Sequence, residues 1–405
     1  MSVGSSETTS SGLTDVLDKW LAEHESDLID TRHNLHRHPE VGYEEHRTTD
    51  LIVRRLKEIG LSGVVLSGGT GVICNIGSGG RVVALRSDID ALPLPDLKEV
   101  PYRSEVPGVC HACGHDAHTA ILLGTAEVLA ELAADAGLPG TVRLLFQPAE
   151  EQLPGGALDV IANFGMRDVE QVYALHCDPR IEVGQIGLRA GPITAAADSV
   201  EVRLSGPGGH TGRPQLTVEL VYALGRVIID LPGLLSRRVD PRSRLSMVWA
   251  SVQAGQAGNA IPSSGVARGT IRVLDRDAWD SAEGIVRTLV QQLVVPTGAH
   301  AEVSYQRGVP PVVNDAASVE LQRVALVAAL GAHAVTGTEQ SMGGEDFAWY
   351  LDHAPGSLAR LGVHTPGAQR VDLHQSAFDI DERALAIGVR FMTHLAVTAL
   401  QHPRR

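Results

Sequence analysis

The stretch Arg81–Asp90, RVVALRSDID, predicts the fold class of the chain. Its apolar run ends abruptly in polar residues, and the same pattern returns at Thr141–Phe146 before two glutamates and at Val172–Leu175 before a histidine. Short apolar runs of this kind, with a helical segment at Thr119–Ala136 between them, are typical of buried strands in a wound α/β sheet. Ligands bind beyond the carboxyl ends of such strands, so we expect the functional groups to lie there.

The rest of the chain predicts a second domain inserted into the first. From about Gly191 the expected elements follow the order β-α-β-β-α-β, which matches a ferredoxin-like α+β unit. Helical periodicity opens and closes the chain, at Leu13–Arg37 and after Asp381. The expected parts are a disordered tail at 1–12, a catalytic domain at 13–190, the inserted domain at 191–304 and the rest of the catalytic domain at 305–405.

Composition excludes several classes of function. The formal net charge is −14, and a surface this negative repels nucleic-acid phosphates and anionic lipid. With 43% hydrophobic and 20% charged residues the composition is that of a globular protein. A small-molecule partner is therefore expected, with neither nucleic acid nor membrane involved.

The cysteine content and the start of the chain predict a cytoplasmic location. Four cysteines in 405 residues are too few for a disulfide framework, which favours a reducing compartment. The first twelve residues have neither a basic region nor an apolar stretch and do not resemble a signal peptide. Apolar segments such as Ala120–Ala134 are interrupted by Glu127 and Glu131, so no membrane helix is expected.

The densest chemical cluster is Cys110–His118, CHACGHDAH. Thiolate and imidazole are preferred zinc ligands, and Gly114 allows the backbone to turn so that Cys113 and His115 aim at one centre. A redox Cys-x-x-Cys is the weaker interpretation, because the interleaved histidines have no task in it. A structural zinc knuckle would need a second Cys or His pair downstream, and none follows at short spacing.

Further polar groups follow the other expected strands. Glu150 and Glu151 precede a flexible loop, and adjacent glutamates point in different directions, so that one can bind metal while the other acts as a general base. His176 stands after another strand. Asp88 and Asp90 are candidate ligands, turn residues or partners that orient a ligating imidazole, and we favour the last role for Asp90.

Glycine-rich loops supply the remaining candidates. The run Gly206–Gly212, GPGGHTG, lacks the Lys-Ser/Thr ending of a phosphate-binding loop, which favours a loop that presents His210 as a hydrogen-bond donor. Asn259 offers an amide before a turn, and the loop at Leu373–Gln375 adds His374.

These motifs, in this order, resemble the aminoacylase, hippurate hydrolase and indoleacetyl-amino-acid hydrolase family of two-metal amidohydrolases, related to carboxypeptidase G. The resemblance runs from about residue 20 to 400. The segments concerned are Leu35–Glu40, Ser87–Pro93, His111–Asp116, Gln147–Glu151, Gly208–His210, Gly343–Phe347 and Leu373–His374.

The resemblance implies a catalytic domain of the zinc-exopeptidase type with a lid and dimerisation domain. It implies two divalent ions per chain, zinc, manganese, cobalt or nickel, and a homodimer formed by the inserted domains. Glu150 would be the general base, and His210 and Asn259 would contact substrate, with His210 reaching the neighbouring subunit's site. The implied metal ligands are Cys113, His115, Glu151, His176 and His374.

The function predicted from the sequence is hydrolysis of the amide bond in N-acyl-L-amino acids or short acylated peptides, by a metal-bridged water with a glutamate base. A dipeptidase or carboxypeptidase with the same site is an open alternative. A metal-dependent binding protein without catalysis is the alternative of a different class, and the complete set of expected ligands argues against it. A zinc-stabilised nucleic-acid module conflicts with the net charge.

Overall fold

The computed structural model describes residues 7–402 and divides into two compact units. Unit 1 comprises the chain up to Gly191, Asn314–Glu339 and the chain from Trp349. Unit 2 comprises Pro192–Val313 and Gln340–Ala348. The second unit therefore extends beyond the expected range of 191–304, because backbone hydrogen bonds join Ile193 and Ala195 to Ser341.

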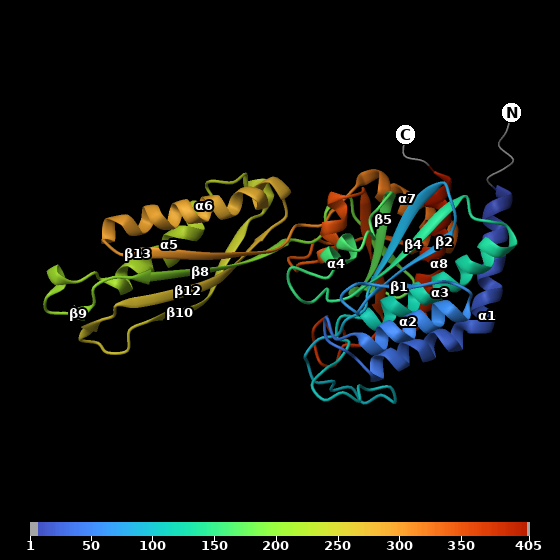
Figure 1. Cartoon of the computed structure of the whole chain (residues 1–405), viewed down its shortest axis with the longest axis horizontal. Coiled ribbons are helices and arrows are strands. Elements are labelled where there is room, and N and C mark those ends of the chain that lie inside the picture. The colour runs from blue at the N-terminus through green and yellow to red at the C-terminus, as the bar shows by residue number, and fades with distance from the viewer. Residues whose placement is uncertain (1–6, 403–405) are drawn as a thin grey trace. The chain divides into compact units, whose positions relative to one another are not determined.

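Unit 1 is built on a mixed sheet, as the sequence predicted, with strand order β1-β2-β4-β3-β5-β16-β6-β15 (Figure 1). Strand β3 lies parallel to both β4 and β5, and β16 lies parallel to β5, whereas β2 runs antiparallel to β4. The strands are β1 (Val64–Val65), β2 (Val72–Gly77), β3 (Arg81–Asp88), β4 (Gly140–Gln147), β5 (Val169–Glu182), β6 (Ile186–Leu188), β15 (Val335–Gly337) and β16 (Gly356–His364).

Helices of unit 1 pack on this sheet and on one another. Helices α3 and α8 both contact β3, and α1 contacts both helices. The helices are α1 (Glu7–Arg37), α2 (His46–Glu58), α3 (His115–Asp135), α4 (Ala157–Ala162), α7 (Ala316–Leu330) and α8 (Arg383–Gln401), with a 3-10 turn at Ala332–Ala334. A further 3-10 turn, Asp346–Asp352, begins in unit 2 and ends in unit 1. The expected tail at 1–12 is wrong from Glu7, where α1 begins, and residues 1–6 lie outside the described part.

Two described helices, α3 and α8, are long and apolar enough to cross a membrane by length and composition alone. In each, 67% of the most apolar window is buried inside the protein. The two helices pack against each other, so their apolar faces form part of the core of unit 1. This packing accounts for their hydropathy.

Unit 2 has a four-stranded antiparallel sheet of order β10-β12-β8-β13, with α5 and α6 packed on it (Figure 1). Alternating residues of β8 face these helices, among them the buried Val200, Val202 and Leu204. The elements are β8 (Ala196–Ser205), β9 (Gly209–His210), α5 (Leu220–Leu235), β10 (Ser246–Ala254), β11 (Ala260–Ile261), β12 (Ser264–Val273), α6 (Arg276–Val294) and β13 (His300–Val309), with 3-10 turns at Pro214–Leu216, Pro241–Ser243 and Val295–Thr297. Short strands β7 (Gly191–Pro192) and β14 (Val313–Asn314) lie where the chain passes between the units.

Candidate metal centre

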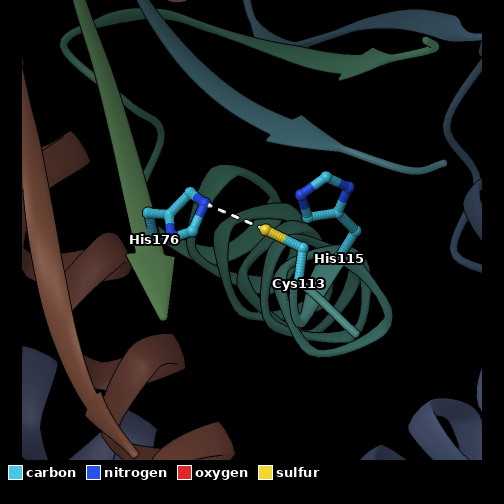
Figure 2. A group of neighbouring side chains, drawn as sticks. All are labelled: Cys113, His115 and His176. Carbon is cyan, nitrogen blue, oxygen red and sulfur yellow. Dashed lines mark hydrogen bonds between the residues drawn. The ribbon is translucent and has the colours of Figure 1, made fainter. Parts of the chain in front are cut away.

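The structure brings the five expected ligands of unit 1 and Glu150 together. The ligand atoms fall into overlapping groups within 4.8 Å of one another, namely Cys113, His115 and His176; Cys113, Glu151 and His374; and His115, Glu150 and Glu151. Figure 2 shows Cys113 just before α3 and His115 at its first residue, with Sγ of Cys113 directed at His176 on β5. These donors come from four separate segments of the chain, so folding alone creates the cluster.

Gly114 makes the turn that joins Cys113 to α3. Its φ is +87°, in the left-handed region that favours glycine. A Cβ on this residue would lie 2.9 Å from Sγ of Cys177. Both observations explain why glycine separates the candidate thiol ligand from the candidate imidazole ligand.

His176 lies inside β5, and not at a strand end as the sequence predicted. Strand β5 runs from Val169 to Glu182, but its pairing with β3 stops at Ala174. Beyond that point β5 continues beside β16, where His176 pairs with Arg360. His176 therefore still emerges where β3 ends, because β5 is the longer strand.

Hydrogen bonds fix the orientation of two imidazoles. Nδ1 of His115 lies 3.0 Å from the carbonyl oxygen of Asp90 and 3.1 Å from its Oδ1, and Nδ1 of His176 lies 2.8 Å from the carbonyl oxygen of Cys177. Because these partners only accept, each Nδ1 carries the proton and directs Nε2 at the cluster. Nε2 of His115 is buried and has no hydrogen-bond partner in the described chain, and Nε2 of His176 lies 3.6 Å from Sγ of Cys113.

The charges at the cluster favour a cation. Burial lowers the pKa of His115, but Asp88, Asp90 and Glu151 outweigh it and raise this pKa to about 10. Burial raises the pKa of the Cys113 thiol well above its usual value, and Glu151, Glu150 and Asp88 raise it further. Burial, with Arg360 and His118, lowers the pKa of His176. Since carboxylates surround a buried thiol and imidazoles, the donor set fits divalent metal ions.

Asp90 and Glu151 are linked directly. Oδ2 of Asp90 accepts a hydrogen bond of 2.9 Å from the backbone N–H of Glu151, while its other oxygen faces His115. Nε2 of His374 lies 3.1 Å from Oε1 of Glu151. His374 has a φ of +60°, and its backbone N–H donates to the carbonyl oxygen of Ala112 at 2.7 Å. The loop of His374 is thus tied to the loop that precedes α3.

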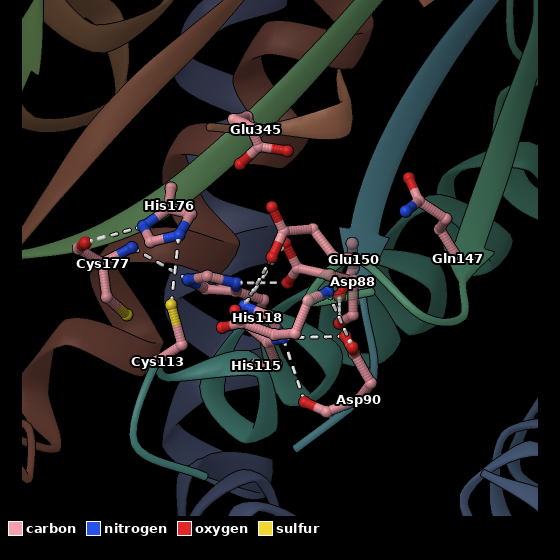
Figure 3. Close-up of polar contacts among 12 residues, drawn as sticks. Asp88, Asp90, Cys113, His115, His118, Gln147, Glu150, His176, Cys177 and Glu345 are labelled. Carbon is pink, nitrogen blue, oxygen red and sulfur yellow. Dashed lines mark hydrogen bonds and ion pairs between the residues drawn. The ribbon is translucent and has the colours of Figure 1, made fainter. Parts of the chain in front are cut away.

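A second layer of polar groups lies behind the cluster; the sequence indicated Asp88 as a candidate, but gave no role to His118 or Arg86 (Figure 3). Nδ1 of His118 lies 2.6 Å from Oδ1 of Asp88, and the backbone N–H of Cys177 donates to Nε2 of His118 at 2.8 Å. Arg86 forms an ion pair with the same Asp88 at 2.5 Å. The spacing of His118 one helical turn after His115 is the signal that could have indicated it.

A buried ionic network supports the first turn of α3. Asp116 accepts hydrogen bonds from Arg32 at 2.9 Å and from His36 at 2.7 Å, both on α1. Asp96 lies 3.3 Å from the other ring nitrogen of His36. Arg32 also pairs with Asp379 and Glu382. The partners in these contacts are separated by 60 to 350 residues in the sequence, so no local sequence pattern predicts them.

The two expected substrate contacts lie in unit 2. His210 is on β9 and pairs with Ala260 on β11, directly after Asn259. The backbone N–H of Thr211 donates to the carbonyl oxygen of Asn259 at 3.3 Å, so the two loops are joined. The run Gly206–Gly212 thus contains a short strand, β9, and a 3-10 turn at Pro214–Leu216 follows it before α5.

Comparisons with known proteins agree with this arrangement. The family model described as peptidase family M20/M25/M40 matches residues 84–398. An N-acetylcysteine deacetylase of Bacillus subtilis is 37% identical over 377 residues, which are 92% of this chain and 97% of that protein. The crystal structure of a dinuclear metal binding peptidase from the M20 family, also of Bacillus subtilis, has a TM-score of 0.81 at 33% identity, covering 94% of this chain and 99% of that one.

A longer protein also matches. A Rhodococcus jostii protein that bears the name of a glutamate–cysteine ligase is 46% identical over 378 residues, which are 93% of this chain. The aligned part is only 47% of that protein, so this chain spans about half its length.

Proposed function

The chain belongs to peptidase family M20/M25/M40 and is a metal-dependent amide hydrolase, and on this premise we propose that its substrates are N-acyl-L-amino acids or short acylated peptides. The proposal is supported by the clustering of five candidate metal ligands beside a second carboxylate, that of Glu150. The five are Cys113, His115, Glu151, His176 and His374. A relative that is similar over nearly its whole length is named for removing an acetyl group from N-acetylcysteine.

We assign the role of general base to Glu150. Its Oε2 lies 4.0 Å from Nε2 of His115, and both glutamates lie close to that imidazole. We assign Glu151, which also lies near Cys113 and His374, to the ligands and Glu150 to proton transfer. In the proposed reaction Glu150 takes a proton from the attacking water and then delivers it to the departing amine. One carboxylate thereby acts as base and then as acid.

Five residues would hold two divalent ions, zinc, manganese, cobalt or nickel: Cys113, His115, Glu151, His176 and His374. When bound, the ions polarise the acyl carbonyl and lower the pKa of water. Asp90 orients two of the five, through the imidazole of His115 and the backbone of Glu151.

His210 is proposed to donate a hydrogen bond to the carbonyl oxygen that becomes negative in the tetrahedral intermediate. The backbone N–H of Gly212 donates to Nδ1 of His210 at 2.9 Å, so the proton of the neutral ring is on Nε2. Nε2 is then a donor, as an oxyanion contact requires. Asn259, on the adjoining loop, is the second proposed substrate contact.

We further propose a homodimer formed through unit 2, with His210 serving the neighbouring subunit's site. Helix α5 exposes apolar side chains that no described residue covers, including Val221, Tyr222 and Ile229, the last with an exposed fraction of 77%. Strand β10 lies at an edge of its sheet and exposes Val248 and Val252. Apolar surface beside an open sheet edge is typical of an interface. Sedimentation of the purified protein tests the dimer, and a monomer at micromolar concentration would exclude it.

All four cysteines are unpaired and buried, which supports a cytoplasmic location. Fractionation of cells that produce the protein tests this proposal, and recovery outside the cytoplasm would contradict it.

The experiment that tests the function is amine release from a panel of N-acetyl, N-benzoyl and indoleacetyl amino acids. N-acetylcysteine belongs in the panel, and unblocked dipeptides form a separate arm. Hydrolysis of the acylated compounds that a chelator abolishes is the expected result. Activity confined to the dipeptides would replace the proposal with a dipeptidase, and metal binding without any turnover would favour a binding protein.

A further inference from the structure

Ala149, the residue before the proposed base, has an unfavourable backbone conformation. Its φ is +50°, in the left-handed region, although its side chain is not that of glycine. Such a conformation persists only where surrounding contacts enforce it, and it costs of order 1–3 kcal/mol. Glu150 and Glu151 follow directly, so the direction of both carboxylates depends on this one backbone torsion.

One side chain holds this backbone from outside the loop. Oε1 of Glu45, which lies just before α2, accepts a hydrogen bond of 2.7 Å from the backbone N–H of Ala149. The sequence separation between the two residues is 104. Glu45 is completely buried, so water cannot replace the contact.

Two more contacts complete the surroundings of Ala149. Its carbonyl oxygen accepts a hydrogen bond of 3.0 Å from the backbone N–H of Gly156. Gly42 packs so closely that a Cβ there would lie 3.0 Å from Cα of Ala149. The carbonyl oxygen of Gly42 also accepts from Nε2 of Gln152 at 2.8 Å. The segment from Gly42 to Glu45 therefore packs against the loop that carries Glu150 and Glu151 and fixes its position.

The contacts of Glu45 indicate that the length of its side chain, which places Oε1 at the N–H of Ala149, is important for this hydrogen bond, and that its negative charge is not. Oε2 is buried and has no hydrogen-bond partner in the described part of the chain. Burial raises the pKa of Glu45 to about 7, with Asp90 adding to the rise and hydrogen bonds to backbone groups opposing it. The hydrogen bonds that its carboxylate accepts come from backbone N–H groups. A group whose one bonded oxygen accepts from an amide can do so equally well as an uncharged amide oxygen.

We propose that Glu45 is a positioning residue, whose Oε1 holds Ala149 in the left-handed conformation that aims Glu150 and Glu151 at the metal centre. This inference rests on the proposed roles of Glu150 and Glu151. Glu45 itself touches neither the substrate nor the metal in this proposal. It acts through the backbone of one residue.

Two conservative variants separate reach from charge. E45D keeps the charge but draws the acceptor back by one methylene, whereas E45Q keeps the reach and loses the charge. We expect E45D to lower kcat and the affinity for Co²⁺ by roughly 10- to 100-fold, with KM little changed, and E45Q to stay close to wild type. E44Q is the matched control, because Glu44 is an exposed neighbour that undergoes the same chemical change.

A third variant tests the role of the backbone torsion. Glycine adopts the left-handed region without cost. The double variant E45D/A149G is therefore expected to recover part of the kcat and the Co²⁺ affinity that E45D alone loses. Metal binding is measured by the visible absorption of Co²⁺ titrated into the apoprotein, and folding by thermal melts of every variant. These two measurements need no turnover.

Three results would each overturn the inference. They are wild-type kcat and Co²⁺ affinity in E45D, equal losses of both in E45D and E45Q, and no recovery of either when A149G is added to E45D. If the wild type hydrolyses no compound of the panel, the proposed function fails, and the Co²⁺ affinities of E45D and E45Q still decide the role of Glu45. If E150Q turns over like wild type, the proposed base is wrong while the Co²⁺ result stands by itself.

Discussion

Asp90 contacts His115 with one carboxylate oxygen, at 3.1 Å from Nδ1, and with the other accepts the backbone N–H of Glu151 at 2.9 Å. D90N leaves one of these two N–H donors facing an amide NH₂ group. We expect a loss of roughly 10- to 100-fold in metal affinity or kcat, measured by Co²⁺ titration and steady-state kinetics. D50N, on the exposed side of α2, is the control, and unchanged metal affinity and kcat in D90N would refute the role of Asp90.

The glutamine variants of Glu150 and Glu151 are expected to lose different properties. E150Q should keep its metal content and lose roughly 100- to 10,000-fold in kcat, because only proton transfer is removed. E151Q should lose metal content, because a proposed ligand is changed. Metal analysis of the desalted proteins, beside kinetics, checks both, and E150Q with wild-type kcat would exclude Glu150 as the base.

Metal removal should affect stability as well as turnover. A chelator is expected to abolish hydrolysis, and zinc, manganese, cobalt or nickel should restore it to different extents. Because a ligand that binds only the folded state stabilises it, saturating metal at about 100 times its Kd adds about 2.7 kcal/mol per site. Thermal melts with and without chelator measure this, and identical melting temperatures would contradict a folded-state metal centre.

His36 gives a pH dependence of stability. Burial lowers its pKa, but Asp116 and Asp96, which face its two ring nitrogens, raise it above 6.5. A raised pKa contributes stability that is fully present below pH 6.5 and is lost as the pH rises through the folded-state value. H36Q should therefore lose more stability relative to wild type at about pH 6 than at about pH 9.

Urea unfolding at the two pH values measures the effect of H36Q, with the exposed His333, changed to Gln, as control. A deficit of H36Q that grows toward high pH would show that His36 is neutral in the folded protein.

Trp279 and Asp198 hold unit 2 together. The buried indole Nε1 donates to Oδ1 of Asp198 at 2.9 Å, and the same carboxylate accepts from Tyr305 at 2.6 Å and from the backbone of Gly308 at 3.0 Å. W279F removes one donor from a buried charge and should cost about 1–3 kcal/mol in the free energy of unfolding. W249F, whose indole donates to a backbone carbonyl oxygen at 3.2 Å, is the comparison, and an equal or smaller loss in W279F would contradict this role.

Local pattern predicted the sheet of unit 1 and the placement of its donors. The run at Val82–Leu85 is part of β3, and Asp90 lies two residues beyond the end of that strand, because an apolar run that stops marks where burial stops. His118 could also have been assigned from the sequence, because it follows His115 by one helical turn and therefore lies on the same face of the helix. His176 shows the limit of this argument, because the length of β5 depends on its pairing with β16, a strand that lies far later in the sequence and places Arg360 opposite His176.

Glu45 shows why the rest could not be predicted. It stands in a loop without periodicity, beside an exposed glutamate of the same type, and its partner is a backbone N–H rather than a side chain. Nothing in the local sequence distinguishes Glu45 from Glu44. The contact between Arg32 and Asp116 has the same character, because a buried ion pair between distant elements leaves no mark on the spacing of either.

The interior position of β16 has a consequence for how the protein is made. In the sheet of unit 1 this strand separates β5 from β6, yet β16 (Gly356–His364) is synthesised after every residue of unit 2, whose last residue is Ala348. A nascent chain that has emerged only to about residue 190 therefore exposes an edge of β5 that the finished protein covers. Such edges pair with other chains, so translation that pauses within unit 2 would leave an aggregation-prone intermediate on the ribosome.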